Sequence, residues 1–288
     1  MIYQIIADSG STKTDWVLVK ENAVLKEFST QGLNPYQLSF NELVLIIQED
    51  VWPVFQIEVL HLTQLSIFFY GAGCGSEEKQ KVVKEALQLV IPAQTVEVFD
   101  DMLGAARALC GKNIGIACIL GTGSNSCCYD GNRIVDNKPA PGYVLGDEGG
   151  GAHLGKLLLI DFINDEMPFG LKEMMKLEFS LSNDIIYENV YKRKFPNRYL
   201  ASFAVFIKQE INGEYGTYLE QLVLNNFQIY FNKHIKKYDK KWGTTLNTVG
   251  SVGYHFEKEF LKIAQQNGYR VETKLKSPIK GLVSYHSK

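Results

Sequence analysis

Short apolar runs alternate with small polar turns at the beginning of the chain. Residues 2–7 and 14–19 are rich in aliphatic side chains and predict two β-strands, and residues 8–12 (DSGST) predict the turn that joins them. A polar turn at 20–22 leads into a third strand. This order of elements predicts a three-stranded antiparallel meander.

The same order recurs in the middle of the chain. Residues 114–120 predict an apolar strand, 121–124 (GTGS) a turn, 125–129 a second strand, and 130–132 (DGN) a tight turn before a third strand. Two copies of one pattern indicate that the fold is duplicated.

Apolar residues at helical spacing occur between the two meanders and again after the second one. Between them we expect helices and strands in alternation, at 38–50, 65–70, 77–89, 96–99 and 103–109. After the second meander we expect mainly helices, at 154–163, 172–179, 202–211 and 218–238, then a short strand before 250–253 and a last helix at 257–266. The alternation predicts an α/β fold.

The length of the chain agrees with two such units. Its 288 residues correspond to two domains at roughly 150 residues each. We expect an N-terminal domain at 1–112, and a C-terminal domain with extra helices at 113–288 whose final helix can pack back on the first. Two domains also predict a cleft for a ligand.

Composition and charge narrow the function classes. With 45% hydrophobic and 22% charged residues the chain is expected to fold, and a formal charge of -2 gives no field to attract nucleic acid or an anionic membrane. No apolar run is long enough to span a bilayer, and the first residues lack the pattern of a secretion signal. The five cysteines are odd in number and contain no CxxC, so reduced thiols and a cytoplasmic location are expected.

The two small-residue turns are candidate phosphate sites. Residues 8–12 and 121–125 offer backbone N–H groups that can approach an oxyanion closely, with Lys13 as an added charge and Asp8 as a ligand for hydrated magnesium. A plain hairpin turn is the alternative for each one alone, but the repetition favours phosphate. No Walker A or dinucleotide fingerprint explains the turns, and residues 71–76 (GAGCGS) are expected to line a ligand.

Acidic residues at two places are candidate site residues. One pair follows a predicted strand, and another lies within a glycine-rich segment. Asp100 and Asp101 close the strand at 96–99, where one can cap the next helix and the other can act as a general base; their spacing does not say which. Asp147 stands in 146–151 (GDEGGG), where so many glycines are entropically costly for a simple helix cap. We therefore expect Asp147 to accept hydrogen bonds from sugar hydroxyls.

Four segments together resemble a known family. DSGSTKTDW, LGTGSNS, GDEGGG and GSVG occur in the order of the phosphate 1, phosphate 2, sugar-contact and adenosine segments of N-acetylglucosamine kinases, which belong with the BadF/BadG-type ATPases. The resemblance implies the fold of the actin, sugar-kinase and chaperone-ATPase superfamily, in which two duplicated ribonuclease H-like α/β domains close over ATP.

The resemblance also implies site residues. Asp101, followed by Gly104 and Ala105, matches the catalytic base, and Asp8 stands near the magnesium ion, in contact through water. The residues expected at ATP are Ser11, Thr12, Lys13, Gly121, Thr122, Gly123, Gly250, Ser251 and Gly253. The residues expected at the substrate are Asn34, Gly75, Asp101, Gly142 and Asp147.

The leading hypothesis is ATP-dependent phosphorylation of an amino sugar, with N-acetylglucosamine converted to its 6-phosphate as the first candidate. Residues 140–143 (APGY) replace the Gly-Trp-Gly that such kinases often have, so glucosamine or another amino sugar stays open. The alternatives are an ATPase activator of the radical dehydratase or benzoyl-CoA reductase type, which needs an iron-sulfur cluster, and a sugar sensor without catalysis. The expected partners are ATP, Mg²⁺ and the sugar, without nucleic acid or membrane and with a homodimer left open.

Overall fold

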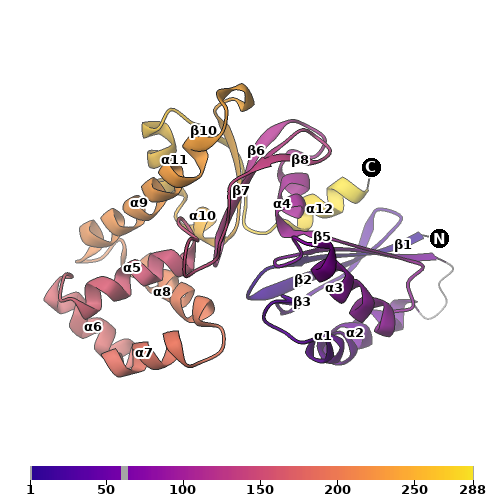
Figure 1. Ribbon diagram of the computed structural model, residues 1–288, viewed down its shortest axis with the longest axis horizontal. Helices are drawn as coiled ribbons and strands as arrows, with labels where there is room; N and C mark the ends of the chain where they lie inside the picture. The colour runs from indigo at the N-terminus through magenta and orange to yellow at the C-terminus, as the bar shows by residue number, and fades with distance from the viewer. Residues whose placement is uncertain (1, 60–63, 288) are drawn as a thin grey trace. The chain divides into compact units, whose positions relative to one another are not determined.

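A computed structural model describes residues 2–59 and 64–287, which form two compact units (Figure 1). Unit 1 comprises Met1–Asn113, Tyr129–Ile134 and Ser277–Lys288, and unit 2 comprises Ile114–Cys128 and Val135–Lys276. Within the described part of the chain no helix is long and apolar enough to cross a membrane.

Unit 1 is built on a five-stranded sheet in the order β3-β2-β1-β4-β5. Strands β1 to β3 form the antiparallel meander, and β4 and β5 run parallel to β1. The strands are β1 (Ile2–Ser9), β2 (Lys13–Lys20), β3 (Ala23–Gln31), β4 (Gln64–Gly71) and β5 (Thr95–Asp100). The helices are α1 (Phe40–Ile46), α2 (Trp52–Val59), α3 (Glu77–Val90), α4 (Asp101–Cys110) and α12 (Ile279–His286), with a π-helical turn (Ile47–Val51) between α1 and α2.

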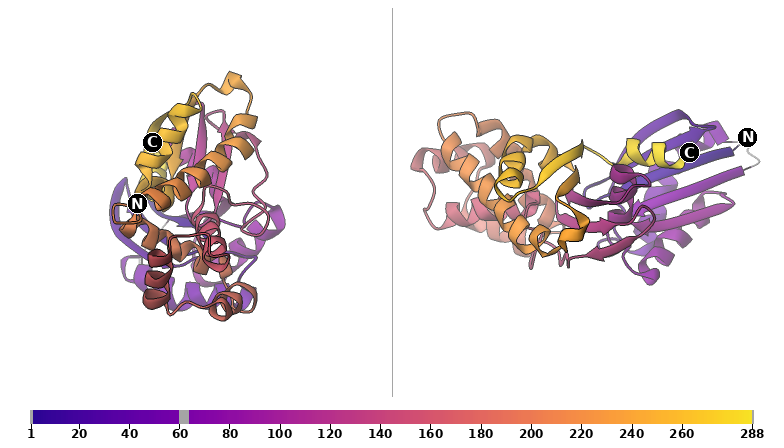
Figure 2. Two further views of the ribbon diagram at one scale, coloured as in Figure 1. Left: turned by 90° about the vertical axis from the view of Figure 1, so that its left-hand side faces the viewer. Right: turned by 90° about the horizontal axis from the view of Figure 1, so that it is seen from above.

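This sheet has an apolar layer on each face. The neighbours Ile5 and Ile6 of β1 point to opposite sides, as the pleat of a strand requires. Ile5 packs in the layer formed by α1, α2 and α3, whereas Ile6 packs with Ile279 and Leu282 of α12. The central strands are therefore buried on both sides, whereas the edge strand β3 is mostly exposed. Helix α12 lies beside β1 and α4 (Figure 2).

Unit 2 repeats the topology. Its sheet has the order β10-β9-β6-β7-β8, which is the order of unit 1 read from the other edge, with β6, β7 and β8 in the places of β1, β2 and β3. The strands are β6 (Gly115–Leu120), β7 (Ser124–Tyr129), β8 (Ile134–Asn137), β9 (Thr245–Val249) and β10 (Arg270–Leu275). The duplicated α/β fold predicted from the two meanders is confirmed.

The helices of unit 2 form its larger part. They are α5 (Gly151–Ile163), α6 (Phe169–Phe179), α7 (Asn183–Tyr191), α8 (Pro196–Glu210), α9 (Gly216–Lys233), α10 (Ser251–His255) and α11 (Glu257–Gln266), with short 3-10 turns at Ile235–Lys237 and Lys240–Trp242. Helices α5 and α8 approach so closely that a Cβ on Gly155 would lie 1.9 Å from the carbonyl oxygen of Leu200. The apolar faces of the helices of unit 2 pack together and form its core, which is rich in aromatic residues.

The pattern of the sequence missed five helices and strands, namely α2, α7, α10, α12 and β10. The helix expected at 257–266 is α11 and packs on α9, whereas α12 is part of unit 1 and packs on β1 and α4. The compact units are also not continuous stretches, because the hairpin tip Tyr129–Ile134 belongs to unit 1. Tyr129 donates to the carbonyl of Gly111 at 3.2 Å, which holds this tip against the end of α4.

Candidate functional site

The parallel strands of unit 1 end side by side at one edge of the sheet. The register places Ser9 beside Gly71 and Gly71 beside Asp100. Asp8 precedes the first of these residues and Asp101 follows the last. The edge therefore gathers the turn after β1, the glycine-rich turn after β4 and the aspartate pair after β5, an edge where α/β folds commonly bind ligands.

The turn between β1 and β2 is closed by backbone hydrogen bonds. Gly10 donates to the carbonyl of Lys13 at 2.9 Å, and Gly32 donates to that of Thr12 at 3.1 Å. Ser11 and Thr12 stand at its tip, where the Thr12 side chain is exposed. The turn has a fixed shape and leaves small polar residues at its surface.

Asp15 is a buried carboxylate that no sequence motif distinguishes. It accepts hydrogen bonds from Lys13 Nζ at 2.9 Å, Ser29 Oγ at 2.6 Å and Ser277 Oγ at 2.9 Å. Burial raises its pKa, but the hydrogen bonds from Lys13, Ser29 and Ser277 lower it overall. Lys13, expected at the ATP phosphates, is thus paired with Asp15 in this structure.

Asp8 lies directly across the hairpin from Asp15. Burial raises the pKa of Asp8 to about 7, with a further increase from the charge of Asp15 and a smaller decrease from Lys13. Its carboxylate accepts no side-chain or backbone hydrogen bond from the described residues. A bound cation would offset both the burial of the Asp8 carboxylate and the repulsion from Asp15, so these residues fit a metal ion.

The number of ligands limits the kind of metal site. Within residues 2–59 and 64–287 no group of three or more histidine, cysteine or acidic side chains could hold a metal ion. Magnesium needs no such group, since it keeps several waters and binds through one or two carboxylates. Asp8 therefore fits a hydrated magnesium ion better than a fully protein-ligated one.

Asp100 and Asp101 differ in their surroundings, and Asp100 provides the cap that was expected of one of them. Asp100 is the N-cap of α4, and its Oδ1 accepts the backbone N–H of Met102 at 2.8 Å. Asp101 is the first residue of α4. Burial raises the pKa of Asp101 well above its ordinary value, and the charges of Asp100 and Asp8 raise it further. Burial and the two neighbouring carboxylates thus all favour the protonated form of Asp101.

Asn34 packs against the glycine-rich turn after β4. Its Oδ1 accepts the backbone N–H of Tyr36 at 2.9 Å, and a Cβ on Gly73 would lie 2.4 Å from the same oxygen. Gly75 adjoins Asp100, since its Cβ would lie 3.4 Å from Asp100 Oδ2. The predicted substrate residues Asn34, Gly75 and Asp101 are thus assembled at one edge of unit 1.

In unit 2 the turn Gly121–Ser124 is joined to the glycine-rich segment that follows Gly146. Gly151 donates to the carbonyl of Gly121 and Ala152 to that of Thr122, both at 2.8 Å. A Cβ on Gly150 would lie 2.6 Å from the carbonyl carbon of Gly123. Only glycine permits this approach, so the second predicted phosphate turn and the predicted sugar segment form one assembly.

Asp147 is directed at this turn. Its backbone is left-handed, with φ 62°, and its Oδ1 accepts the N–H of Ser124 at 3.2 Å. Burial raises the pKa of Asp147, although the Ser124 amide opposes the change. The expected role of Asp147 at the sugar stays a prediction, and the structure adds that this side chain contacts the predicted phosphate turn of its own unit.

The predicted adenosine segment lies against the end of β6. Gly250 has φ 120°, and its Cβ would lie 2.4 Å from the carbonyl oxygen of Leu120. A Cβ on Gly253 would lie 3.1 Å from the Leu120 side chain, and Ser251 begins α10 with an exposed side chain. The expected nucleotide residues of unit 2 therefore lie around Leu120 and Gly121.

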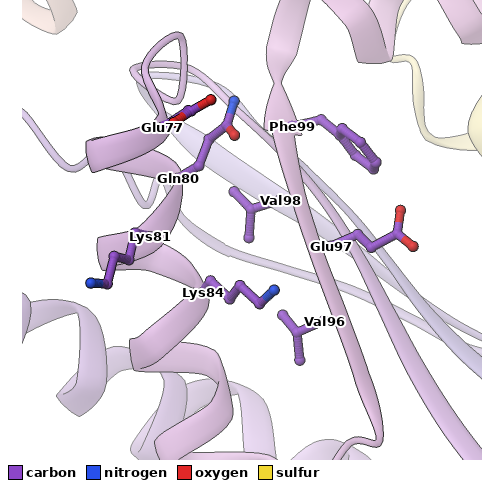
Figure 3. A pocket seen from close by; sticks show the side chains of 8 residues that line it. All are labelled: Glu77, Gln80, Lys81, Lys84, Val96, Glu97, Val98 and Phe99. Carbon is purple, nitrogen blue, oxygen red and sulfur yellow. The ribbon is translucent and has the colours of Figure 1, made fainter.

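Gly142 adjoins the glycine-rich segment, because its carbonyl accepts the N–H of Gly146 at 2.8 Å, whereas one surface cavity lies apart from the predicted site residues. Gly142 has φ 82°, and a Cβ on it would meet nothing within 4 Å. A cavity of about 400 Å³ opens between α3 and the edge strand β5, lined by Glu77, Gln80, Lys81, Lys84 and residues 96–99 (Figure 3). None of the predicted site residues lines this cavity.

Comparison with known proteins identifies the family. No protein-family model matches the chain, and neither does any curated protein. A crystal structure named "putative N-acetylglucosamine kinase" from Porphyromonas gingivalis is 41% identical over 100% of this chain and 99% of that one, with a TM-score of 0.92. A second structure of that name, from Chromobacterium violaceum, is 15% identical over 99% of both chains, with a TM-score of 0.73. MreB5 of Spiroplasma citri bound to ADP is 11% identical over 99% of this chain and 94% of that one, with a TM-score of 0.58, and shares the fold.

Proposed function

Because the chain belongs to the N-acetylglucosamine kinase-like family of actin-like ATPases, we propose that it transfers the terminal phosphoryl group of ATP to an amino sugar. The observation that most supports this proposal is Asp101. A half-buried carboxylate with a raised pKa stands at the carboxyl edge of the unit 1 sheet, beside the Asp8 turn and the substrate turn.

Asp101 is the proposed general base. It would accept the proton of the sugar hydroxyl as that oxygen attacks phosphorus, while Asp100 holds the first turn of α4 in place. Asp8 would hold the hydrated magnesium ion of the nucleotide, which when bound neutralises charge on the phosphates. The turns at 8–12 and 121–124 would donate backbone N–H groups to the phosphate oxygens, and Gly250, Ser251 and Gly253 would contact the adenosine.

N-acetylglucosamine is the proposed sugar, phosphorylated on its 6-hydroxyl. The support for this sugar is the similarity to the Porphyromonas gingivalis structure named putative N-acetylglucosamine kinase, which is 41% identical over the whole chain. We therefore expect a preference for the acetylated sugar.

ADP release measured with ATP, magnesium and a panel of N-acetylglucosamine, glucosamine and glucose tests the proposal. Asp101→Asn should lower sugar-dependent kcat by about 10²- to 10⁴-fold, the usual contribution of a general base. Asp100→Asn is the matched control, because asparagine also caps helices well, and it should lose less than about tenfold. Turnover that needs no sugar, or equal losses in the two variants, would contradict the assignment.

A further inference from the structure

One face of α9 carries polar side chains that lie inside the aromatic core of unit 2, except at its end, where the Lys233 side chain is 55% exposed. Asn226, Tyr230, Lys233 and His234 follow one another at the spacing of helical neighbours, the last of them capping the helix. Asn226 and Tyr230 are fully buried, and His234 is buried as well. Buried polar side chains need specific partners, and here the partners lie in the glycine-rich segment that carries Asp147.

Asn226 binds three groups around this segment. Its Oδ1 accepts the backbone N–H of Gly149 at 3.0 Å and lies 2.7 Å from Nδ1 of His153, and its Nδ2 donates to the carbonyl of Gly150 at 3.4 Å. Burial lowers the pKa of His153, which favours the neutral ring that donates through Nδ1. One amide side chain thus fixes two consecutive residues of the loop.

Lys233 and His234 hold the residue that follows Asp147. Glu148 is buried, and its two carboxylate oxygens meet Lys233 Nζ at 2.5 Å and His234 Nε2 at 3.1 Å. Its backbone carbonyl accepts Ser124 Oγ at 2.6 Å. Glu148 is thereby tied to α9 by its side chain and to the predicted phosphate turn by its backbone.

The backbone of this loop needs such support. Asp147 and Gly149 both have left-handed φ values, of 62° and 86°, and the first is costly for a residue with a side chain. Gly149 also packs on Tyr230, because a Cβ on it would lie 2.9 Å from Tyr230 Cβ. Strained conformations persist where surrounding contacts determine them, and α9 supplies those contacts.

We propose that Asn226, Lys233 and His234 are positioning residues, which fix the loop at 147–152 and through it the turn Gly121–Ser124 that binds nucleotide phosphates. The proposal rests on the proposed function for the identity of the ligand. None of the three side chains needs to touch that ligand. Their effect passes through Glu148, Gly149 and Gly150 to the amides of the turn.

Two substitutions test this arrangement. Asn226→Ala removes the acceptor of Gly149 and the donor to Gly150, and Lys233→Met leaves Glu148 with His234 alone. Lys233→Arg keeps a cation that can reach Glu148 and is the rescue variant. Phe227→Leu is the control for stability, since Phe227 is fully buried on α9 and packs on Phe260, with its ring centroid 5.2 Å away.

Binding of Mg·ADP by isothermal titration calorimetry is the first measurement. We expect Asn226→Ala and Lys233→Met to raise Kd by about 10- to 100-fold, because a misplacement of about 1 Å in a binding site has effects of this size. Lys233→Arg should restore Kd to within about threefold of wild type. Phe227→Leu should lower the midpoint of thermal unfolding and leave Kd unchanged.

Hydrogen exchange of the ligand-free protein is the second measurement and does not depend on the proposed function. The segments 121–125 and 147–152 should exchange at least about tenfold faster in Asn226→Ala and Lys233→Met, but not in Phe227→Leu. Unchanged exchange, or equal acceleration in Phe227→Leu, would overturn the positioning role. If wild type bound no Mg·ADP, the proposed function would fail, and the exchange data would still decide the role of α9.

Discussion

Asp8→Asn removes a buried carboxyl group whose ionisation lowers the stability of unit 1. Burial and the charge of Asp15 raise the pKa of Asp8 from 3.8 to about 7. This change corresponds to about 4 kcal/mol between the two protonation states, as an upper limit. Asparagine has the shape of the protonated carboxyl group and never ionises, so the variant should avoid the cost.

The pH range of the effect follows from linkage. Below pH 3.8 the carboxyl is protonated in both the folded and the unfolded protein, so Asp8 adds nothing to the pH dependence. Between 3.8 and about 7 the unfolded chain releases the proton and the folded protein keeps it, so stability falls as pH rises. Above about pH 7 the loss is complete. Asp8→Asn should therefore match wild type near pH 4 and exceed its unfolding free energy by up to about 4 kcal/mol near pH 8.

Urea unfolding at pH values from 4 to 8, with and without magnesium, measures this difference. Magnesium should stabilise wild type at pH 8 and have little effect on Asp8→Asn, because binding to the folded state alone raises its stability. The variant should also lose nucleotide-dependent turnover. Unfolding free energies of the two proteins that run parallel from pH 4 to 8 would refute the account of Asp8 as a buried, strained carboxylate.

Two glycines at close approaches give further tests. In Gly150→Ala the new Cβ would lie 2.6 Å from the backbone of Gly123 and must separate the loop from the turn, so kcat/KM for ATP should fall by at least about tenfold; an unchanged value would refute that contact. In Gly281→Ala the Cβ would lie 2.5 Å from the Ala108 carbonyl oxygen, and we expect urea unfolding to show a loss of about 1–3 kcal/mol. Ser284→Ala, on the exposed side of α12, should stay within about 0.5 kcal/mol of wild type, and equal losses would argue against a tight contact between α12 and α4.

The duplicated fold could be predicted because its signal is local and repeated. Each meander alternates apolar strands with turn residues, and the second copy reproduces the first with different side chains. The elements that were missed have weak local patterns. Strand β10 (RVETKL) contains three charged residues and is only partly buried, and α12 is eight residues long, so both depend on the surfaces on which they pack.

The supporting residues of the site could not be predicted, because their partners are distant in sequence. Ser277 meets Asp15 across 262 positions, and Asn226 meets Gly149 across 77. Neither residue belongs to a motif, and asparagine or serine on a helix or loop is usually a solvent-facing residue. Glu148 stood inside a recognisable segment, but only the three-dimensional structure shows that it turns away from Asp147 toward α9.

The sequence motif does not distinguish Asp100 from Asp101, but the backbone geometry does. Both residues are acidic and adjacent in sequence. Which of them caps α4 depends on the residue at which the strand ends and the helix begins. Asp100 keeps an extended backbone, with φ -65° and ψ 145°, which turns its carboxylate to the N–H of Met102. Asp101 already has helical geometry and stands near Asp8, whose charge helps to raise its pKa. A shift of the helix start by one residue would exchange the two roles, so the proposed base depends on a single backbone boundary.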